Sequence, residues 1–143
     1  MDLAPRITMI TLGVADVAAS TAFYERLGFV KSSASNPSVT FFRMKGTVLG
    51  LFGRADLAKD ARVADSAPGF SGVTIAHNLG SEREVDDAYA HALSSGAKPV
   101  KNPESVFWGG YSGYFRDPDG HLWEVAYNPV FPLDEDGRMR LPA

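Results

Sequence analysis

The stretch from residue 109 to residue 128 constrains the fold of this chain more than any other. Two runs rich in aromatic and β-branched residues flank the tetrapeptide Asp117-Pro118-Asp119-Gly120. In such a tetrapeptide the aspartate can bond to its own backbone, the proline fixes φ, and the glycine accepts a positive φ. The stretch therefore predicts a β-hairpin that turns at residues 117–120.

Glu124 lies in the middle of the second strand of this hairpin. Because side chains alternate along a strand, it points to the face opposite to Trp123 and Val125. A carboxylate that is buried without a partner is costly, so we expect it to meet a cation, a hydrogen-bond donor, a metal ion or a pocket that admits water. A purely structural glutamate, paired with Arg43 or Arg116 or facing solvent, is equally compatible with the pattern.

The composition limits the classes of protein to which the chain can belong. With 143 residues it can form one domain, or two small modules, with a core of its own. It contains no cysteine, which excludes disulfides, thiolate metal sites and a cysteine nucleophile. The net charge of −3 comes from 14 basic and 17 acidic residues scattered along the chain, so nucleic acid is not an expected partner. The apolar run at residues 7–15 is too short to span a bilayer and makes a poor signal peptide, so we expect no membrane partner and a cytoplasmic location.

The first part of the chain has the element order β-α-β-β-β. Alternation predicts a strand at residues 7–14, and Asp16 and Gly28 are typical of the two ends of the helix that follows. Turn residues then separate three further strands, which we expect at residues 29–33, 39–44 and 47–52. The first module is thus predicted to span residues 1–53.

The second part repeats this order after a linker at residues 54–70 that has room for one helical turn. We expect a strand at residues 71–78. Ser81 and Glu84 then have the spacing of a capping box, and an apolar stripe continues the helix to Gly96. A strand at residues 98–103 contains Pro99, which favours a sheet edge or a bulge.

With the hairpin described first, these elements form a second module at residues 71–128, followed by a tail at residues 129–143. Gly28 and Gly96 end equivalent helices and are 68 residues apart. The repeated order predicts a duplicated unit, with two sheets that face each other around a cleft. The tail has no periodicity, and it either packs on a partner subunit or stays mobile.

Two motifs identify a family resemblance. The first joins residues 10–16 with Ser20, Phe23-Tyr24 and residues 27–29, and the second is the segment 115–124. Together they resemble the vicinal oxygen chelate superfamily, which includes glyoxalase I, extradiol dioxygenases, fosfomycin-resistance enzymes and bleomycin-resistance proteins. The resemblance implies an α+β fold of two βαβββ modules that form half-open barrels of mixed sheet with outer helices. It also implies a homodimer and a small organic ligand inside the barrel, but the fold hosts many chemistries and does not assign one.

The resemblance also implies where a metal ion would be held in metal-using members. The corresponding positions are Met9, residues 49–51, Val73 and Glu124, of which only Glu124 is a donor. Catalytic Zn²⁺, Fe²⁺ or Mn²⁺ sites need three or four oxygen, nitrogen or sulfur ligands, and a thioether with aliphatic side chains does not supply them. We therefore expect no metal and no cofactor, and disfavour chemistry that depends on an ion.

The histidines are the alternative source of a metal ligand or an acid/base group. On the predicted strand, His77 shares a face with Val73 and would point into the same cavity, as a general base, as a ligand-binding group, or simply satisfied by backbone. A shifted register that brings His77 and Glu124 onto one ion supplies only two ligands. His91 and His121 are expected at the surface.

Two classes of function remain open. The first is a small-molecule-binding protein of the glyoxalase/bleomycin-resistance type, with an organic ligand in a metal-free cavity. The second is a glyoxalase-like lyase or dioxygenase-type enzyme with Glu124 as acid/base or metal ligand, and a pure interaction module is a third possibility. The candidate catalytic residue is Glu124. The candidate binding residues are Met9, Thr11, Val73, His77, Trp108, Tyr114 and Glu124.

Overall fold

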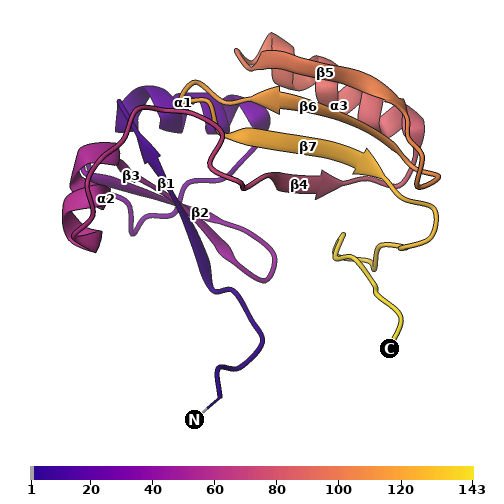
Figure 1. The fold of residues 1–143 in the computed structure, drawn as a ribbon, viewed down its shortest axis with the longest axis horizontal. Helices are drawn as coiled ribbons and strands as arrows, with labels where there is room; N and C mark the ends of the chain where they lie inside the picture. The colour runs from indigo at the N-terminus through magenta and orange to yellow at the C-terminus, as the bar shows by residue number, and fades with distance from the viewer. Residues whose placement is uncertain (1) are drawn as a thin grey trace. The chain divides into compact units, whose positions relative to one another are not determined.

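The structure is a computed structural model that describes residues 2–143. Contacts divide the chain into two compact units, Met1–Ala67 and Pro68–Ala143, and the boundary falls within the segment predicted as a linker. Each unit has one mixed β-sheet with helices packed on it, so the predicted α+β class is confirmed. Figure 1 shows the elements of both units. None of the helices in the described part of the chain is both long and apolar enough to cross a membrane.

The first unit contains a sheet of three strands in the order β1-β3-β2. β1 (Met9–Val14) runs parallel to β3 (Val48–Gly53), and β2 (Val39–Arg43) runs antiparallel to β3. α1 (Val17–Leu27) connects β1 to the rest of the sheet. The Asp16 side chain accepts a hydrogen bond from the backbone of Ala19, and Gly28 ends the helix with φ of 114°, as the sequence predicts.

The strand predicted at residues 29–33 does not form, which corrects the sequence-based prediction. This segment does run beside β2, through a single bridge between Lys31 and Phe42 and a backbone hydrogen bond from Ser32 to Phe41. The side-chain Oγ of Ser35 instead accepts a hydrogen bond from the backbone N–H of Phe41 at 3.0 Å. Serine side chains that bond to backbone in this way compete with the regular ladder, and pairing is therefore interrupted.

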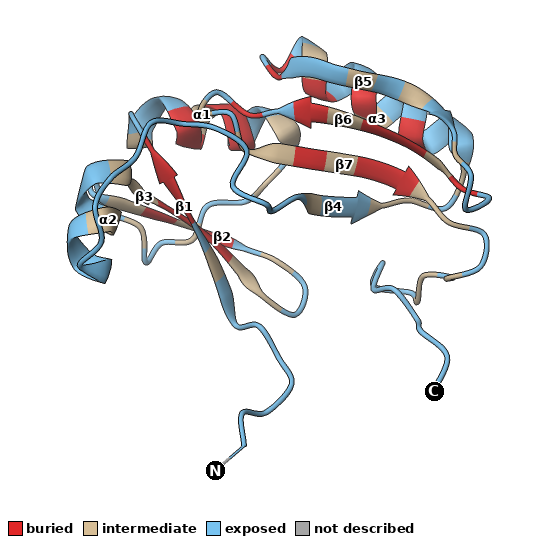
Figure 2. Cartoon of the chain, in the orientation of Figure 1, coloured by how far each residue is buried: buried red, intermediate tan, exposed pale blue. Residues whose placement is uncertain are grey.

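The two faces of the first sheet are buried to different extents, and buried and less buried residues alternate along β2 (Figure 2). One face is buried under α1, where the hydroxyl groups of Thr21 and Thr40 lie 2.7 Å apart. The buried side chains on this side are Leu12, Val14, Phe42, Leu49 and Leu51 from the strands and Phe23 and Tyr24 from α1. The other face, here called the first open face, carries Met9, Thr11, Phe41, Arg43, Val48 and Gly50.

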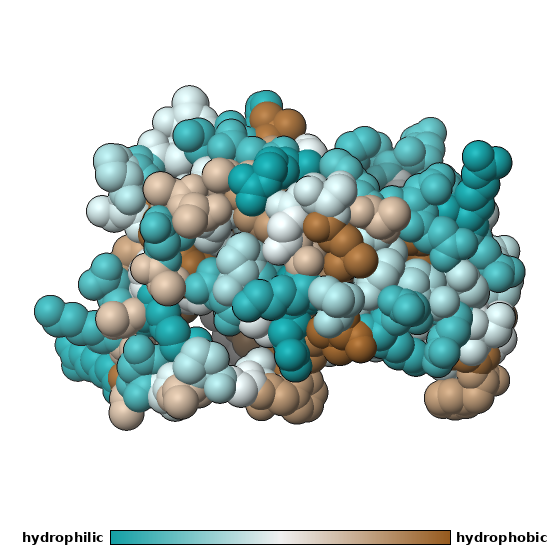
Figure 3. Space-filling view, turned by 90° about the horizontal axis from the view of Figure 1, so that it is seen from above, coloured by the Kyte–Doolittle hydropathy of each residue, from teal (hydrophilic) through white to brown (hydrophobic). Residues whose placement is uncertain are grey.

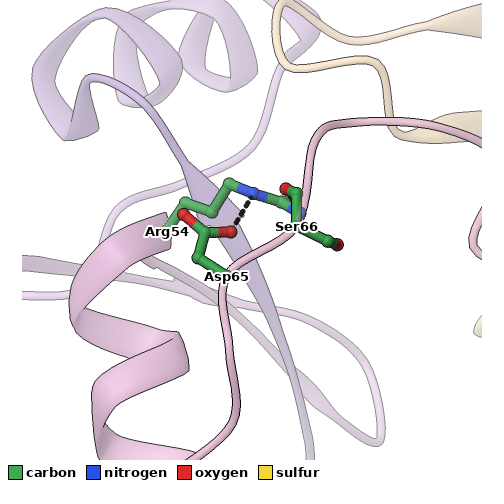
Figure 4. Close-up of polar contacts among 3 residues, drawn as sticks. All are labelled: Arg54, Asp65 and Ser66. Atoms are coloured by element: carbon green, nitrogen blue, oxygen red, sulfur yellow. Dashed lines mark hydrogen bonds and ion pairs between the residues drawn. The ribbon is translucent and has the colours of Figure 1, made fainter.

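The linker contains a helix, α2 (Arg54–Ala61), and so has more structure than the single turn that the sequence suggests. α2 begins directly after β3, and Arg54 lies against Gly13 of β1, where an added Cβ would be 3.2 Å from the Arg54 Cα. The Arg54 side chain also holds the segment after the helix, through Asp65 at 2.8 Å and the carbonyl of Ser66 at 2.8 Å (Figure 4).

The second unit contains a sheet of four strands in the order β4-β7-β6-β5. Its strands are β4 (Ile75–Asn78), β5 (Lys98–Ser105), β6 (Tyr111–Arg116) and β7 (Leu122–Tyr127). β4 pairs with β7 in parallel and the other neighbours are antiparallel, so the predicted β-α-β-β-β order is confirmed. α3 (Glu82–Ser94) begins with the predicted capping box, in which Ser81 accepts from the Glu84 backbone at 3.2 Å and bonds to its carboxylate at 3.0 Å.

α3 covers one face of this sheet. Phe115 and Trp123 stack there with ring centroids 6.4 Å apart, beside the buried Val125. Tyr111, on the same face, donates a hydrogen bond to Asp86 of α3 at 2.7 Å. The opposite face, here called the second open face because α3 does not cover it, carries Ala76, Ser112, Tyr114, Glu124 and Ala126. Of these residues, Ser112 and Ala126 are buried.

The hairpin turn and the edge strand follow the sequence-based prediction. Asp117 is fully buried, and its Oδ1 accepts from the backbone of Asp119 at 3.0 Å and of His121 at 2.8 Å. β5 is an edge strand whose pairing with β6 shifts register twice, as its prolines require. At the second shift the backbones come so close that a Cβ on Gly113 would lie 2.8 Å from the Pro103 nitrogen.

The tail is more ordered than its lack of periodicity indicates. Leu133 and Met139 form an isolated bridge, closed by a backbone hydrogen bond from Asp134 to Arg138 at 2.8 Å. Within this turn, Asp134 accepts from the backbone amides of Asp136 and Arg138, both at 2.9 Å. Residues 134–137, an acidic segment that ends in glycine, thus form a turn.

Candidate functional site

Tyr114 and Glu124 form the polar centre of the second open face. They are direct partners in the antiparallel pair of β6 and β7, so their side chains lie on the same face. Loss of water, the negative charge of Glu124 and a hydrogen bond to Glu124 together raise the pKa of the Tyr114 hydroxyl. The residue that lies directly beside Glu124 on this face is therefore a tyrosine, which carries a hydroxyl group.

The neighbour of Glu124 on β4 is Ala76, not Val73. β4 begins at Ile75, and Val73 precedes it with 60% of its surface exposed. The position inferred from the family resemblance therefore lies outside the strand. Because Ala76 has no donor atom, the correction does not supply Glu124 with a second metal ligand.

His77 lies on the opposite face of the sheet from Glu124. It pairs with Val125, whose side chain is on the α3 side. This contradicts the expectation that His77 shares a cavity with Glu124, and it excludes the shared two-ligand site. The physical reason is the period of a strand, since a shift of one residue moves a side chain to the other face. The His77 side chain is exposed, yet nearby protein atoms displace enough water to lower its pKa.

The other two histidines lie apart from this pair. His91 is exposed near the end of α3, as expected. His121 is half-buried behind the hairpin turn rather than fully exposed, and its backbone is bonded to Asp117.

Trp108 lies in the loop between β5 and β6. The loop is closed by backbone hydrogen bonds between Val106 and Gly110 and between Gly109 and Val106, both 3.0 Å long. The Trp108 ring covers Gly110, which leaves no room for a Cβ at that position, and the ring keeps 38% of its surface exposed. Trp108 is therefore held by its own loop rather than by the strands that carry Tyr114 and Glu124.

On the first open face, Met9 and Thr11 lie over Gly50. A Cβ built on Gly50 would be 3.3 Å from the Thr11 Oγ1 and 3.6 Å from the Met9 Sδ. The structure thus brings Met9 and Thr11 together, as the alternation of residues 7–14 predicts. It also identifies Gly50 as the residue of 49–51 that shares their face.

A pocket of about 260 Å³ lies on this face, at the side where residues 29–36 run beside β2. Its walls are mostly apolar, with one arginine and one serine. The lining residues are Met9, Ser32, Ala34, Phe41, Phe42, Arg43 and Val48. Apolar walls with a few polar groups are the usual make-up of a small-molecule site.

Of these residues, the sequence pointed to Met9 as a ligand contact. It missed Arg43 and Val48 as pocket residues, although alternation within β2 would have placed Arg43 on the same face as Phe41. Ser32 could not be found, because its place depends on a segment that forms no regular strand.

The residues at the metal positions do not fit a catalytic ion. On the first open face they offer a thioether, a threonine hydroxyl and a glycine, and on the second a single carboxylate beside Ala76. Within residues 2–143, no three histidine, aspartate or glutamate side chains come close enough together to hold an ion. The prediction that the protein uses no metal stays a prediction, and the donor chemistry gives it its physical basis.

Two α+β units, each with a mixed sheet, one helix-covered face and one open face, define the class of protein. The profile of the Glyoxalase/Bleomycin resistance protein/Dioxygenase superfamily matches residues 6–125. The chain belongs to this superfamily, as the resemblance implied.

Solved structures agree with this membership. A glyoxalase-related enzyme from Fulvimarina pelagi is 35% identical, with 98% of this chain and 100% of that chain covered and a TM-score of 0.88. A glyoxalase/bleomycin resistance protein/dioxygenase from Nocardioides is 30% identical, with 89% and 85% covered and a TM-score of 0.74. A hypothetical protein from S. aureus, 23% identical with 89% and 96% covered and a TM-score of 0.76, supports the fold alone. Comparison with curated proteins gave no significant match.

Proposed function

We propose that the chain binds a small organic molecule in the pocket of its first open face, without a resident metal ion, as a binding protein of the glyoxalase/bleomycin-resistance type. The observation that carries this proposal is the apolar pocket of about 260 Å³ beside Met9. In the resemblance, Met9 occupies a position where metal-using members have a ligand. Methionine adapts its shape to an organic surface but is a poor ligand for a hard ion. A methionine at this position therefore favours apolar contact with a ligand over coordination of a metal ion.

The test is a screen of small organic fragments against protein with isotope-labelled methionine methyl groups. Fragments that occupy the pocket should shift the Met9 methyl resonance. Phe41→Ala should weaken such binding several-fold, because Phe41 forms a wall of the pocket. If no fragment class shifts the Met9 resonance, the proposal is wrong.

An enzymatic function is the second candidate, and the Tyr114–Glu124 pair favours it. A carboxylate beside a hydroxyl on the same sheet face can accept a proton from a substrate while the hydroxyl orients that substrate. In this case Glu124→Gln would abolish turnover and retain substrate binding, whereas a recognition role would show as lost affinity. The glyoxalase-related enzyme from Fulvimarina pelagi makes this candidate worth testing.

The homodimer and the cytoplasmic location remain predictions from the family resemblance and the composition.

A further inference from the structure

We infer that the pocket on the first open face takes a small organic anion, an apolar tail that ends in one carboxylate, with the carboxylate bound at Arg43. This inference rests on the proposed function and names the ligand class for the same pocket.

The apolar part of the pocket sets the size of the tail. Met9, Phe41 and Val48 supply its hydrocarbon and aromatic walls. A volume of about 260 Å³ equals that of roughly nine water molecules at about 30 Å³ each. This suits an acid with a short aliphatic chain or one aromatic ring.

Arg43 supplies the charge. Its side chain is exposed at the pocket wall, and within residues 2–143 its guanidinium group makes no hydrogen bond or ion pair. Its backbone pairs with Val48 of β3 and donates to the carbonyl of Val30. By contrast, Arg54 is held by Asp65. A guanidinium presents a planar fork of donors that matches a carboxylate, so an uncommitted arginine beside an apolar pocket is suited to an organic acid.

Ser32 supplies a second donor at the same wall. Its Oγ accepts a hydrogen bond from the backbone of Ala34 at 3.1 Å, and its own proton has no acceptor among the contacts of the described chain. A hydroxyl that accepts one bond in this way still has a proton to donate. Because Ser32 and Arg43 line the same pocket, the Ser32 hydroxyl is a second donor for a carboxylate bound there.

The charge distribution along the chain favours an anion over a cation. Although the net charge is −3, residues 26–55 contain five basic residues and no acidic one. The basic residues are Arg26, Lys31, Arg43, Lys45 and Arg54. Arg54 is neutralised by Asp65, but Arg43 lies at the pocket itself, and none of the residues that line the pocket is acidic. The local charge at the pocket therefore favours an anion over an ammonium group.

Three probes of the same length separate these contributions: hexanoate, its neutral analogue hexanamide and its cationic analogue hexylammonium. Binding is followed at the Met9 methyl resonance of the full chain. Hexanoate should bind saturably, hexanamide about tenfold more weakly, and hexylammonium more weakly still, because a charge-assisted hydrogen bond is lost and then replaced by repulsion.

Variants assign the effect to Arg43. Arg43→Gln should weaken hexanoate about tenfold or more and leave hexanamide unchanged, and Arg43→Lys should give an intermediate affinity. Arg83→Gln, which removes an exposed arginine of α3, is the matched control and should change neither affinity. The amide spectrum of each variant reports whether it is folded.

The outcomes distinguish the two proposals. Three results would overturn the anion inference while pocket binding stands. Hexanoate and hexanamide could bind equally, Arg43→Gln could weaken both equally, or hexylammonium could bind more tightly than hexanoate. If none of the three probes shifts the Met9 resonance but other fragments do, the inference again fails alone. If neither the probes nor any fragment shifts it, the proposed function fails as well.

Discussion

Tyr114 and Glu124 stand directly opposite each other on β6 and β7, and the carboxylate lies near enough to the tyrosine hydroxyl to help raise its pKa. The half-buried Glu124 thus has a polar side chain as its direct neighbour on β6. The sequence left open which group lies beside Glu124, and the structure places Tyr114 there. It also gives the second open face one polar centre.

The first prediction concerns this pair. Glu124→Gln should lower the pKa of Tyr114, because it removes the negative charge and the carboxylate acceptor that help to raise it. The measurement is a pH titration of isotope-labelled tyrosine rings. Asp86→Asn is the matched control, since a hydrogen bond to Asp86 is the main cause of the raised pKa of Tyr111. The account is contradicted if Asp86→Asn shifts Tyr114 as much as Glu124→Gln does.

A second prediction concerns the approach of β5 to β6. Gly113→Ala should lower the free energy of unfolding by about 1–3 kcal/mol, because the added Cβ would meet backbone atoms that cannot move independently. These are the Pro103 nitrogen at 2.8 Å and the Lys101 oxygen at 2.9 Å. Urea denaturation measures the loss.

Gly69→Ala is the control for this substitution, because nothing lies within 4 Å of its added Cβ and its φ is not positive. It should leave the unfolding midpoint unchanged or raise it slightly. Equal stability of the two variants would show that β5 does not approach β6 as described.

The third prediction concerns pH and the tail. The backbone hydrogen bond from Arg138, assisted by that from Asp136, lowers the pKa of Asp134 below its ordinary value of 3.8. A group whose pKa is depressed in the folded state stabilises that state above the ordinary pKa, and the contribution is lost as the pH falls through the folded value. The turn at residues 134–138 should therefore loosen in acid, below about pH 3.8, and hold at neutral pH.

Hydrogen exchange and amide shifts of Asp136 and Arg138 measure this loosening. Asp134→Asn is the control, because its side-chain oxygen still accepts hydrogen bonds but has no proton to gain. A tail that loosens at the same pH in this variant would show that another group controls it.

The hairpin and the starts of α1 and α3 could be predicted from the sequence because their signals are local. Asp117 and Gly120 fix the turn within a few residues, and Asp16 and Ser81 mark the first turns of α1 and α3. The turn also sets the register that places Tyr114 opposite Glu124, since Arg116 and Leu122 close the hairpin.

The face of His77 and the pocket could not be predicted in the same way. Where β4 begins depends on its pairing with β7, and an error there puts His77 on the wrong face. The pocket depends on residues 29–36, where Ser35 and Asn36 bond to backbone and replace a regular strand. Such competition is decided by tertiary contacts rather than by periodicity.

The central claim is that the chain recognises an organic ligand through apolar contact and hydrogen bonds, because its open faces lack the donors for a metal ion. The most direct test is elemental analysis of protein purified without chelator, combined with ligand binding before and after chelation. The account predicts substoichiometric divalent metal and unchanged binding at the Met9 methyl resonance. One equivalent of a divalent ion whose removal abolishes ligand binding would contradict it.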